Sequence, residues 1–94
     1  MPAYVIGEVK ILHRDQLGDY GKMVADAVKK FRGRYVARGA EPFVLEGGPA
    51  HNILMIEFPD VETAKAWYAS PEYQAAKKLR QGKTNLRLIV IEAG

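Results

Sequence analysis

The chain has 94 residues and a formal net charge of +3, with 48% hydrophobic and 27% charged residues, which is typical of a globular domain and excludes a disordered chain. Its apolar runs are far shorter than the roughly 20 residues of a membrane-spanning helix, and we expect no signal peptide at its start. Cysteine is absent, which excludes disulfide bonds and thiolate metal sites and favours a cytoplasmic location.

The first part of the chain predicts a strand followed by a helix. Alternating apolar residues predict the strand over 3–12. Asp15 is the expected N-cap of a helix whose apolar stripe recurs every three or four residues as far as Phe31. Gly33 is the expected C′ residue of this helix, because glycine accepts a positive φ.

Two further strands are expected in the middle of the chain. The second strand runs over 34–38 and is stopped by Gly39, with a continuation over 41–46 beyond the kink at a proline. A glycine-rich turn follows. The third strand is expected over 53–58.

Two start signals divide the next helical segment. Asp60 and Ser70 are each expected to cap a helix with a side-chain oxygen. Pro71 suits the first helical position, where its missing N–H costs nothing. We therefore expect two helices, over 61–69 and 71–81.

A last strand over 86–92 completes the order β-α-β-β-α-β in a single domain over residues 1–94. This order predicts an α+β fold of the ferredoxin-like class, an antiparallel sheet with its helices on one face. The other face would carry large apolar side chains, namely Tyr4, Ile6, Ile53, Met55, Ile89 and Ile91. Burying them is worth roughly 9–18 kcal/mol, comparable with the whole stability of a small domain. We therefore predict a homodimer in which two sheets stack about a two-fold axis.

The same uncovered face would also carry charged side chains. Glu8, Lys10, Glu57 and Arg87 belong to it, and Arg34 and Arg38 could join them, since the phase of the second strand is not set by the sequence. Charges in a shared interior must be paired, solvated or bound by a ligand. Two interpretations stay open, salt bridges between the glutamates and the arginines or a polar ligand pocket.

Basic residues gather over 29–34 and 77–87. They could form a nucleic-acid surface, or they could be solvated cations that oppose the negative end of a helix dipole. No nucleic-acid recognition motif accompanies them. We therefore expect neither a nucleic acid nor a membrane as partner.

Signatures of common catalytic sites are absent from the sequence. The two histidines, His13 and His51, stand in expected loops without a metal-ligand spacing, so no metal site is predicted. No nucleophile elbow, phosphate loop or dinucleotide fingerprint occurs, so no cofactor is predicted either. Ser70 precedes a proline and is interpreted as a helix cap rather than a nucleophile.

Aromatic residues cluster around the predicted helix break. Trp67, Tyr68 and Tyr73 could wall a ligand pocket together with Tyr35, or they could pack in the core with their polar tips satisfied. Both interpretations stay open.

Three charged residues are the candidate polar groups of such a pocket. Arg38 and Arg80 would anchor the ligand. Glu57 is the candidate proton acceptor, because desolvation on a buried strand would make its carboxylate more basic.

Short motifs spread over nearly the whole chain carry a family resemblance. They are Ala3-Tyr4, Gly33-Arg34-Tyr35, Arg38-Gly39, Leu45-Glu46-Gly47 and, above all, Ile56-Glu57-Phe58-Pro59 followed by Trp67-Tyr68, Ser70-Pro71-Glu72-Tyr73-Gln74 and Arg80. Through them the sequence resembles domain-of-unknown-function family 1330 (DUF1330), within the dimeric α/β-barrel superfamily. The resemblance implies a ferredoxin-like subunit that forms a barrel-like dimer, and it implies no established activity.

Two positions depart from the family pattern. His51-Asn52 stands where family members often have an arginine, and Ala40 stands where a second glycine is common. Relatives in the superfamily include cofactor-free monooxygenases, lactone isomerases and haem-binding enzymes, which is analogy at the level of the fold. Haem is not expected here, since neither His13 nor His51 is placed inside.

The sequence thus predicts a cytoplasmic homodimer that binds a small organic molecule between sheet and helices and could act on it without a cofactor. The alternative is a non-catalytic dimerisation or binding module without a substrate. The residues leave open whether the protein is an enzyme.

Overall fold

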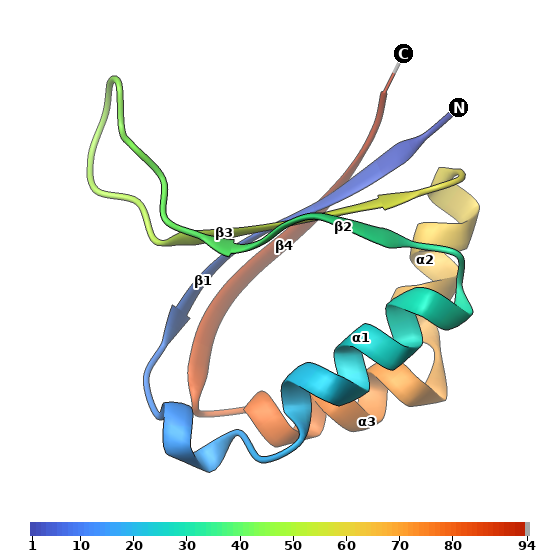
Figure 1. Cartoon of the computed structure of the whole chain (residues 1–94), viewed down its shortest axis with the longest axis horizontal. Helices are drawn as coiled ribbons and strands as arrows, with labels where there is room; N and C mark the ends of the chain where they lie inside the picture. Colours follow the sequence, from blue (N-terminus) through green and yellow to red (C-terminus); the bar gives the residue numbers. More distant parts are fainter. Residues whose placement is uncertain (94) are drawn as a thin grey trace.

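The computed structural model describes residues 1–93. Four strands form one antiparallel sheet in the order β2-β3-β1-β4, and they are β1 (Ala3–Ile11), β2 (Arg34–Ala40), β3 (Asn52–Phe58) and β4 (Thr84–Glu92). A short 3-10 turn, η1 (Arg14–Gln16), precedes three helices, α1 (Tyr20–Lys30), α2 (Val61–Ala69) and α3 (Pro71–Arg80). All three helices lie on one side of the sheet (Figure 1). The predicted α+β, ferredoxin-like arrangement is confirmed.

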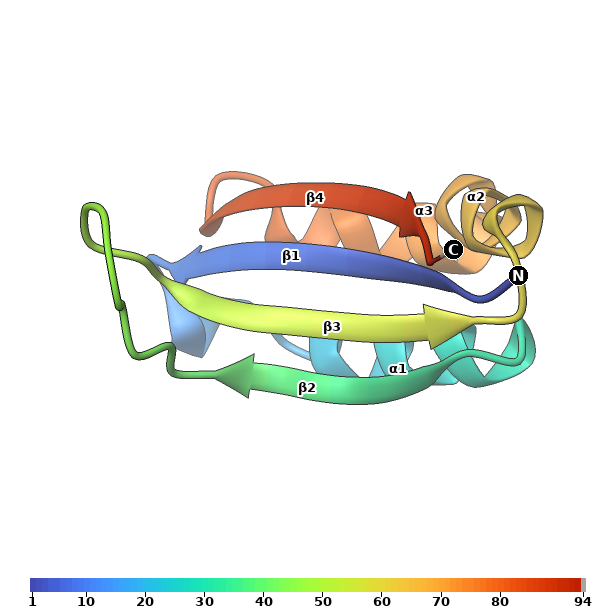
Figure 2. The same ribbon diagram turned by 90° about the horizontal axis from the view of Figure 1, so that it is seen from above.

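The helices divide the covered face of the sheet between them. Figure 2 shows α1 behind β2 and β3, with α2 and α3 behind β1 and β4. Two strands, β2 and β4, form the edges of the sheet. Within residues 1–93, none of the helices combines the length and the apolar character that crossing a membrane would take.

Strand register separates the sheet into two faces. Val5 pairs with Ile56 and Val90 on the side of the helices, which we call the helix face. Ile6 follows in the chain and therefore points to the opposite side, the outer face. It lies opposite Met55 in the neighbouring strand. The predicted alternation of the strands is confirmed.

The core lies between the helices and the helix face. Its largest fully buried side chains are Trp67, Tyr73, Phe58 and Ile56. The ring centroids of Trp67 and Tyr73 are 4.4 Å apart, and those of Trp67 and Phe58 are 5.3 Å apart, both in tilted arrangements. Tilted aromatic pairs of this kind each add about 0.5–1.5 kcal/mol beyond their buried area.

The break between α2 and α3 is formed by side-chain caps, as predicted. Ser70 Oγ accepts a hydrogen bond from Tyr73 N at 3.1 Å and donates one to the Trp67 carbonyl at 2.6 Å. Asp60 Oδ1 accepts from Thr63 N at 2.7 Å, and this hydrogen bond lowers the pKa of Asp60. The caps position Trp67 and Tyr73 on either side of the break, where their rings meet.

The C-terminus of α1 differs from the prediction. Arg32, not Gly33, has the positive φ of 61°. Arg32 N donates to the Lys29 carbonyl and Gly33 N to the Val28 carbonyl, which is a Schellman motif with an arginine at C′. Glycine is needed at 33 for another reason, because a Cβ there would lie 2.7 Å from the Phe58 ring.

The start of α1 also differs. Asp15 lies in the 3-10 turn rather than at the N-cap, and the helix begins only at Tyr20. Gly18 has a φ of 59°, which interrupts helical geometry between the two segments. Asp19 occupies the N-cap position without a side-chain cap bond.

The segment over 41–46 is not the predicted continuation of a strand. It belongs to the loop between β2 and β3, which rises on the side of the sheet away from the helices (Figure 1). Phe43 and Leu45 in this loop are 92% and 96% exposed. Gly39 lies inside β2 with a φ of 71°, next to a register shift between Arg38 and Ala40. This irregularity leads the chain out of the ladder.

Candidate functional site

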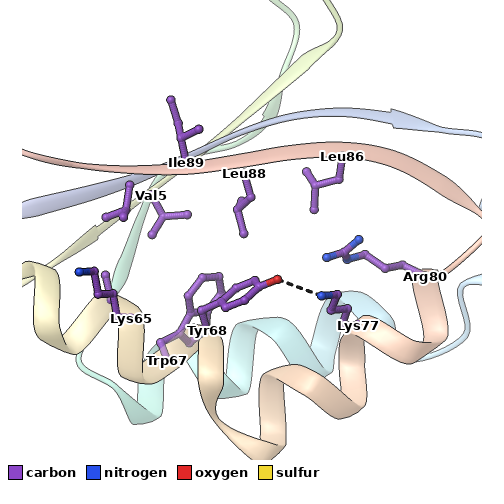
Figure 3. Close-up of a pocket in the computed structure, with 11 residues that line it drawn as sticks. Val5, Lys65, Trp67, Tyr68, Lys77, Arg80, Leu86, Leu88 and Ile89 are labelled. Carbon is purple, nitrogen blue, oxygen red and sulfur yellow. Dashed lines mark hydrogen bonds between the residues drawn. The ribbon is translucent and has the colours of Figure 1, made fainter.

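A cavity of about 500 Å³ lies between the edge strand β4 and the pair α2–α3. We call it the β4 cavity. It is lined by Val5, Ala64, Lys65, Trp67, Tyr68, Lys77, Arg80, Leu86, Leu88, Ile89 and Val90. Figure 3 shows Leu86 and Leu88 pointing from β4 towards the helices, whereas Ile89 points away from them. Since Ile89 still borders the cavity, the cavity reaches the edge of the sheet.

The wall opposite β4 is aromatic. Trp67 is buried in the core, and its neighbour Tyr68 is partly exposed. Lys77 Nζ donates a hydrogen bond of 2.9 Å to the Tyr68 hydroxyl, drawn as a dashed line in Figure 3. Gln74 Nε2 donates to the Tyr68 carbonyl at 2.7 Å, which ties the end of α2 to α3.

Arg80 reaches into the cavity from the last turn of α3 (Figure 3). Its Nη2 donates to the Tyr73 hydroxyl at 3.1 Å. Two residues of this cavity have a polar atom that is buried without a hydrogen-bond partner in the described part of the chain, namely Trp67 Nε1 and Arg80 Nε. Buried polar atoms normally have a partner, so these atoms are polar groups that the described side chains leave unsatisfied.

Burial raises the pKa of two tyrosines on this side of the sheet, Tyr20 and Tyr35. Burial raises the pKa of Tyr20 to about 12, Tyr73 adds to this rise, and Arg80 opposes it. Burial likewise raises the pKa of Tyr35, against the opposing effect of Arg38. Tyr20 and Tyr35 therefore retain their hydroxyl protons throughout the physiological pH range.

A second cavity, of about 480 Å³, lies between the start of α1 and one end of the sheet. We call it the α1 cavity. Its polar lining includes Tyr20, Tyr35 and Arg38. The Arg38 guanidinium lies 4.7 Å from the centroid of the Tyr35 ring and donates to the Gly21 carbonyl at 3.3 Å. Leu86 lines both cavities.

The predicted ligand-binding residues fall into two groups. Trp67, Tyr68 and Arg80 line the β4 cavity, whereas Tyr35 and Arg38 line the α1 cavity. Tyr73 is packed in the core, where it holds Arg80 between the two groups. The structure thus places these residues on one side of the sheet but not in a single pocket, and their roles in binding stay predictions.

Glu57 does not share this location. It pairs in register with Tyr4 and Arg34, so its side chain is on the outer face. Arg34 Nη2 donates to Glu57 Oε1 at 2.9 Å, as the salt-bridge interpretation of this face expected. The expectation that Glu57 would adjoin a pocket between sheet and helices is wrong, because the strict alternation of β3 turns it away.

Register shifts in β2 explain why the position of Arg38 was not predictable. The ladder to β3 is irregular between Tyr35 and Ala37 and again between Arg38 and Ala40. Each extra residue changes which face the following side chain meets. Arg34 is thereby placed on the outer face, and Tyr35 and Arg38 on the helix face.

Sequence reasoning missed the lysines of the β4 cavity. Lys65 follows Val61 by one helical turn, and Lys77 lies four residues after Tyr73 and three before Arg80. Residues three and four apart share a helix face, so this spacing could have identified Lys77 as a neighbour of Arg80. Within residues 1–93, no three histidine or acidic side chains are grouped so that they could hold a metal ion.

Comparison with known proteins supports the family and the fold. The family described as "Domain of unknown function (DUF1330)" matches residues 2–94. None of the curated proteins matches the sequence significantly.

Several solved structures share the fold. A protein of unknown function from Rhodopseudomonas palustris is 20% identical, with a TM-score of 0.78 over 99% of this chain and 82% of that one. A dimeric ferredoxin-like protein of unknown function from Jannaschia sp. CCS1 is 10% identical, with a TM-score of 0.72 over 99% of this chain and all of the other.

SnoaB, a cofactor-independent oxygenase from Streptomyces nogalater, is 8% identical, with a TM-score of 0.60 over 99% of this chain and 93% of that one. At such identities the likeness establishes the ferredoxin-like fold alone. Together with the match over residues 2–94, it leads to one conclusion: the chain belongs to the DUF1330 family.

Proposed function

We propose that the protein is a cytoplasmic homodimer that binds a small organic molecule in the β4 cavity, between sheet and helices. The observation that carries the proposal is the cavity itself, with leucines on one wall and aromatic rings on the other. Lys77 and Arg80 lie at one end of it and Lys65 at the opposite end (Figure 3). Its volume of about 500 Å³ is in the range of small-molecule sites, which are mostly apolar with a few converging polar groups.

Three of the predicted residues would contact the ligand directly. Trp67 and Tyr68 would pack against its body, and Arg80 would bind its polar end. Tyr73 would act through Arg80, whose guanidinium it orients by the 3.1 Å hydrogen bond. Tyr35 and Arg38 would bind a larger ligand that extends into the α1 cavity.

Catalysis without a cofactor would require a proton acceptor at the bound ligand. SnoaB, which shares the fold, is a cofactor-independent oxygenase, but its low identity carries no residue over to this chain. Glu57 was the candidate predicted from the sequence. Since it lies on the outer face, a catalytic role for it would need a separate site between two stacked sheets.

Two features of the outer face support the homodimer. Ile89 and Ile91 are 43% and 46% exposed on this face, although they are large and apolar. The exposed Phe43 and Leu45 are carried by a loop that rises on the same side (Figure 1). Exposed apolar patches mark interaction surfaces, and the structurally similar Jannaschia protein is dimeric. A cytoplasmic location stays an expectation from the composition.

The alternative function is a non-catalytic dimerisation module, in which the outer face is the functional surface and the cavity binds nothing. The apolar outer face favours this candidate as strongly as it favours the homodimer. The two functions differ only in whether the β4 cavity is occupied by a specific molecule.

The single tryptophan provides a direct test of the cavity. Trp67 is the only tryptophan in the sequence, so a proton–nitrogen NMR spectrum contains one indole N–H signal, and it reports on the cavity wall. We expect a screen of small organic molecules to yield compounds that shift this signal together with Tyr68 and Leu88. If binders shift only residues elsewhere, or none is found by NMR and by mass spectrometry of the purified protein, the dimerisation module is the better description.

A further inference from the structure

The charged groups of the β4 cavity all have the same sign. Lys65, Lys77 and Arg80 line it, and no aspartate or glutamate does among the described residues. Within residues 1–93, the ion pairs join Lys30 to Glu72 and Arg34 to Glu57. Neither pair includes a cation of the β4 cavity. The cavity therefore has a positive charge that the protein itself does not compensate.

Arg80 is the cation with the strongest need for an anionic partner. It is half-buried, its Nη2 donates to the Tyr73 hydroxyl rather than to a carboxylate, and its Nε is buried without a hydrogen-bond partner among the described residues. A buried charge is costly unless an opposite charge accompanies it. Tyr20 cannot supply that charge as a phenolate, because burial raises its pKa to about 12.

Glu8 is an acidic residue that borders a hollow together with Arg80, but it does not supply the missing negative charge. This hollow is separate from the β4 cavity and lies at the β4 edge. Its own side chain belongs to the outer face of β1, and it forms no ion pair with Arg80 within the described residues. Tyr73 thus holds the guanidinium in place, and within residues 1–93 no ion pair accompanies its charge.

The rest of the cavity is unsuited to a small inorganic anion. Leu86, Leu88 and Val90 form the β4 wall, and Trp67 and Tyr68 form the opposite one. These surfaces favour an apolar body, since about 25 cal/mol is gained for each Å² of apolar surface removed from water. A ligand that fits both Arg80 and the apolar walls has an anionic head and an aromatic or aliphatic body.

We propose, building on the function proposed above, that the ligand of the β4 cavity is an organic anion whose carboxylate or phosphonate-like head binds Arg80 and whose apolar body lies between β4 and the Trp67–Tyr68 wall. Lys77 is held by the Tyr68 hydroxyl beside this position and adds to the positive potential. Charge-assisted hydrogen bonds from a guanidinium are stronger than neutral ones, so the head group decides the affinity.

The test compares probes of nearly the same shape and different charge. Phenylacetate, benzylphosphonate and neutral phenylacetamide are titrated into the protein, and the Trp67 indole N–H signal and calorimetry report binding. We expect at least one of the two anions to bind about tenfold or more tightly than the amide. The comparison is made on the unaltered protein, so it does not depend on any variant folding.

Variants then locate the charge. Arg80→Gln is expected to abolish the preference for the anions while the amide still binds, and Arg80→Lys is expected to retain part of it. Lys78→Gln is the matched control, because Lys78 is an exposed cation of the same helix outside the cavity lining. It removes the same net charge and should leave the preference intact.

The outcomes separate this inference from the proposed function. Equal or tighter binding of the amide at Trp67 would overturn the anion proposal and leave the small-molecule function standing. A preference for anions that Arg80→Gln and Lys78→Gln reduce equally would also overturn it, since net charge rather than Arg80 would then be responsible. If no probe shifts the Trp67 signal, the anion proposal fails, and the broader screen decides the function itself.

Discussion

The two faces of the sheet are made from the same kinds of residue and end in different environments. Ile56 on the helix face is fully buried, whereas Ile91 on the outer face is 46% exposed. Both belong to strands in which apolar side chains alternate. What differs is the covering, because all three helices pack on one side (Figure 1). The pattern of apolar residues thus determines which side chains can be buried. The layer that packs against each face determines which of them are buried.

The faces also differ in how their charges are compensated. On the outer face, Arg34 and Glu57 neutralise each other at 2.9 Å. On the side of the helices, Arg80 donates to the Tyr73 hydroxyl, and the cavity beside it has no acidic lining among the described residues. A surface that meets another copy of itself can be balanced internally, whereas a binding cavity leaves its complement to the ligand.

The largest effect on stability should come from removing a buried side chain from the helix face. Phe58 is buried against Trp67, so Phe58→Ala is expected to lower the free energy of unfolding by about 3–5 kcal/mol. Denaturant unfolding measures this change. Ile91→Ala, on the outer face, is the matched control and should cost less than about 1.5 kcal/mol in protein diluted to the monomer. Similar losses for both variants would contradict the difference between the faces.

Breaking the outer face should affect assembly instead. Ile6 lies on the central strand β1, and Ile6→Glu would place a charge in the proposed interface. A two-fold interface contains the substitution twice, so we expect the dimer dissociation constant to rise at least about 1000-fold.

Sedimentation over a range of concentrations measures the dimer dissociation constant. Lys29→Glu, an exposed position on α1, serves as control and should leave it within a few-fold of its original value. A dimer that tolerates Ile6→Glu would show that the outer face is not the interface.

A smaller pair of effects concerns the close approach of α1 to the helix face. The backbone of Arg32 has a left-handed conformation, with a φ of 61°, which glycine adopts without strain. Arg32→Gly should therefore raise the free energy of unfolding by about 0.5–1 kcal/mol. Gly33→Ala should lower it by about 1–3 kcal/mol, because the new methyl group would meet the Phe58 ring. Thermal and denaturant unfolding of both variants measure the two signs. If Arg32→Gly lowered the free energy of unfolding and Gly33→Ala raised it, the backbone at the end of α1 would have to adjust freely to both substitutions.

The smallest effect at neutral pH concerns titration of the helix face. The pKa of Tyr20 is raised to about 12 by burial, so the folded state holds this proton more tightly than the unfolded state, where the pKa is about 10. The stabilisation is complete below about pH 10 and is lost as the pH rises towards 12. Unfolding measured at increasing alkaline pH should show this loss, and Tyr20→Phe should reduce it. An unchanged alkaline profile in Tyr20→Phe would assign the loss to other groups.

Local signals predicted the elements that depend on local chemistry. The caps at Asp60 and Ser70 and the proline at position 71 define α2 and α3, because each hydrogen bond joins residues three apart. Alternation of apolar residues predicted both faces of β1, β3 and β4. The same reasoning placed Trp67, Tyr68 and Tyr73 near one another, since they flank one helix break, and the rings of Trp67 and Tyr68 each meet that of Tyr73.

Tertiary structure decided the features that depend on residues distant in sequence. The start of α1 follows a positive-φ glycine rather than Asp15, and the C′ position is taken by Arg32 because Gly33 must pass close to Phe58. Neither contact is visible in a local pattern. Lys65, likewise, is recognised as part of the β4 cavity only once β4 lies across α2 and α3.

By itself the sequence determined the order of the elements, the alternation of the strands and the caps of α2 and α3, because all of these follow from neighbours within a few residues. Only the folded chain decided that Arg38 shares the helix face, whereas the alternation of β3 had already assigned Glu57 to the outer face. The physical reason is the irregular ladder of β2, where an extra residue reverses the side that the next side chain meets. Charge placement in this protein therefore depends on register, which is a property of two strands and not of one.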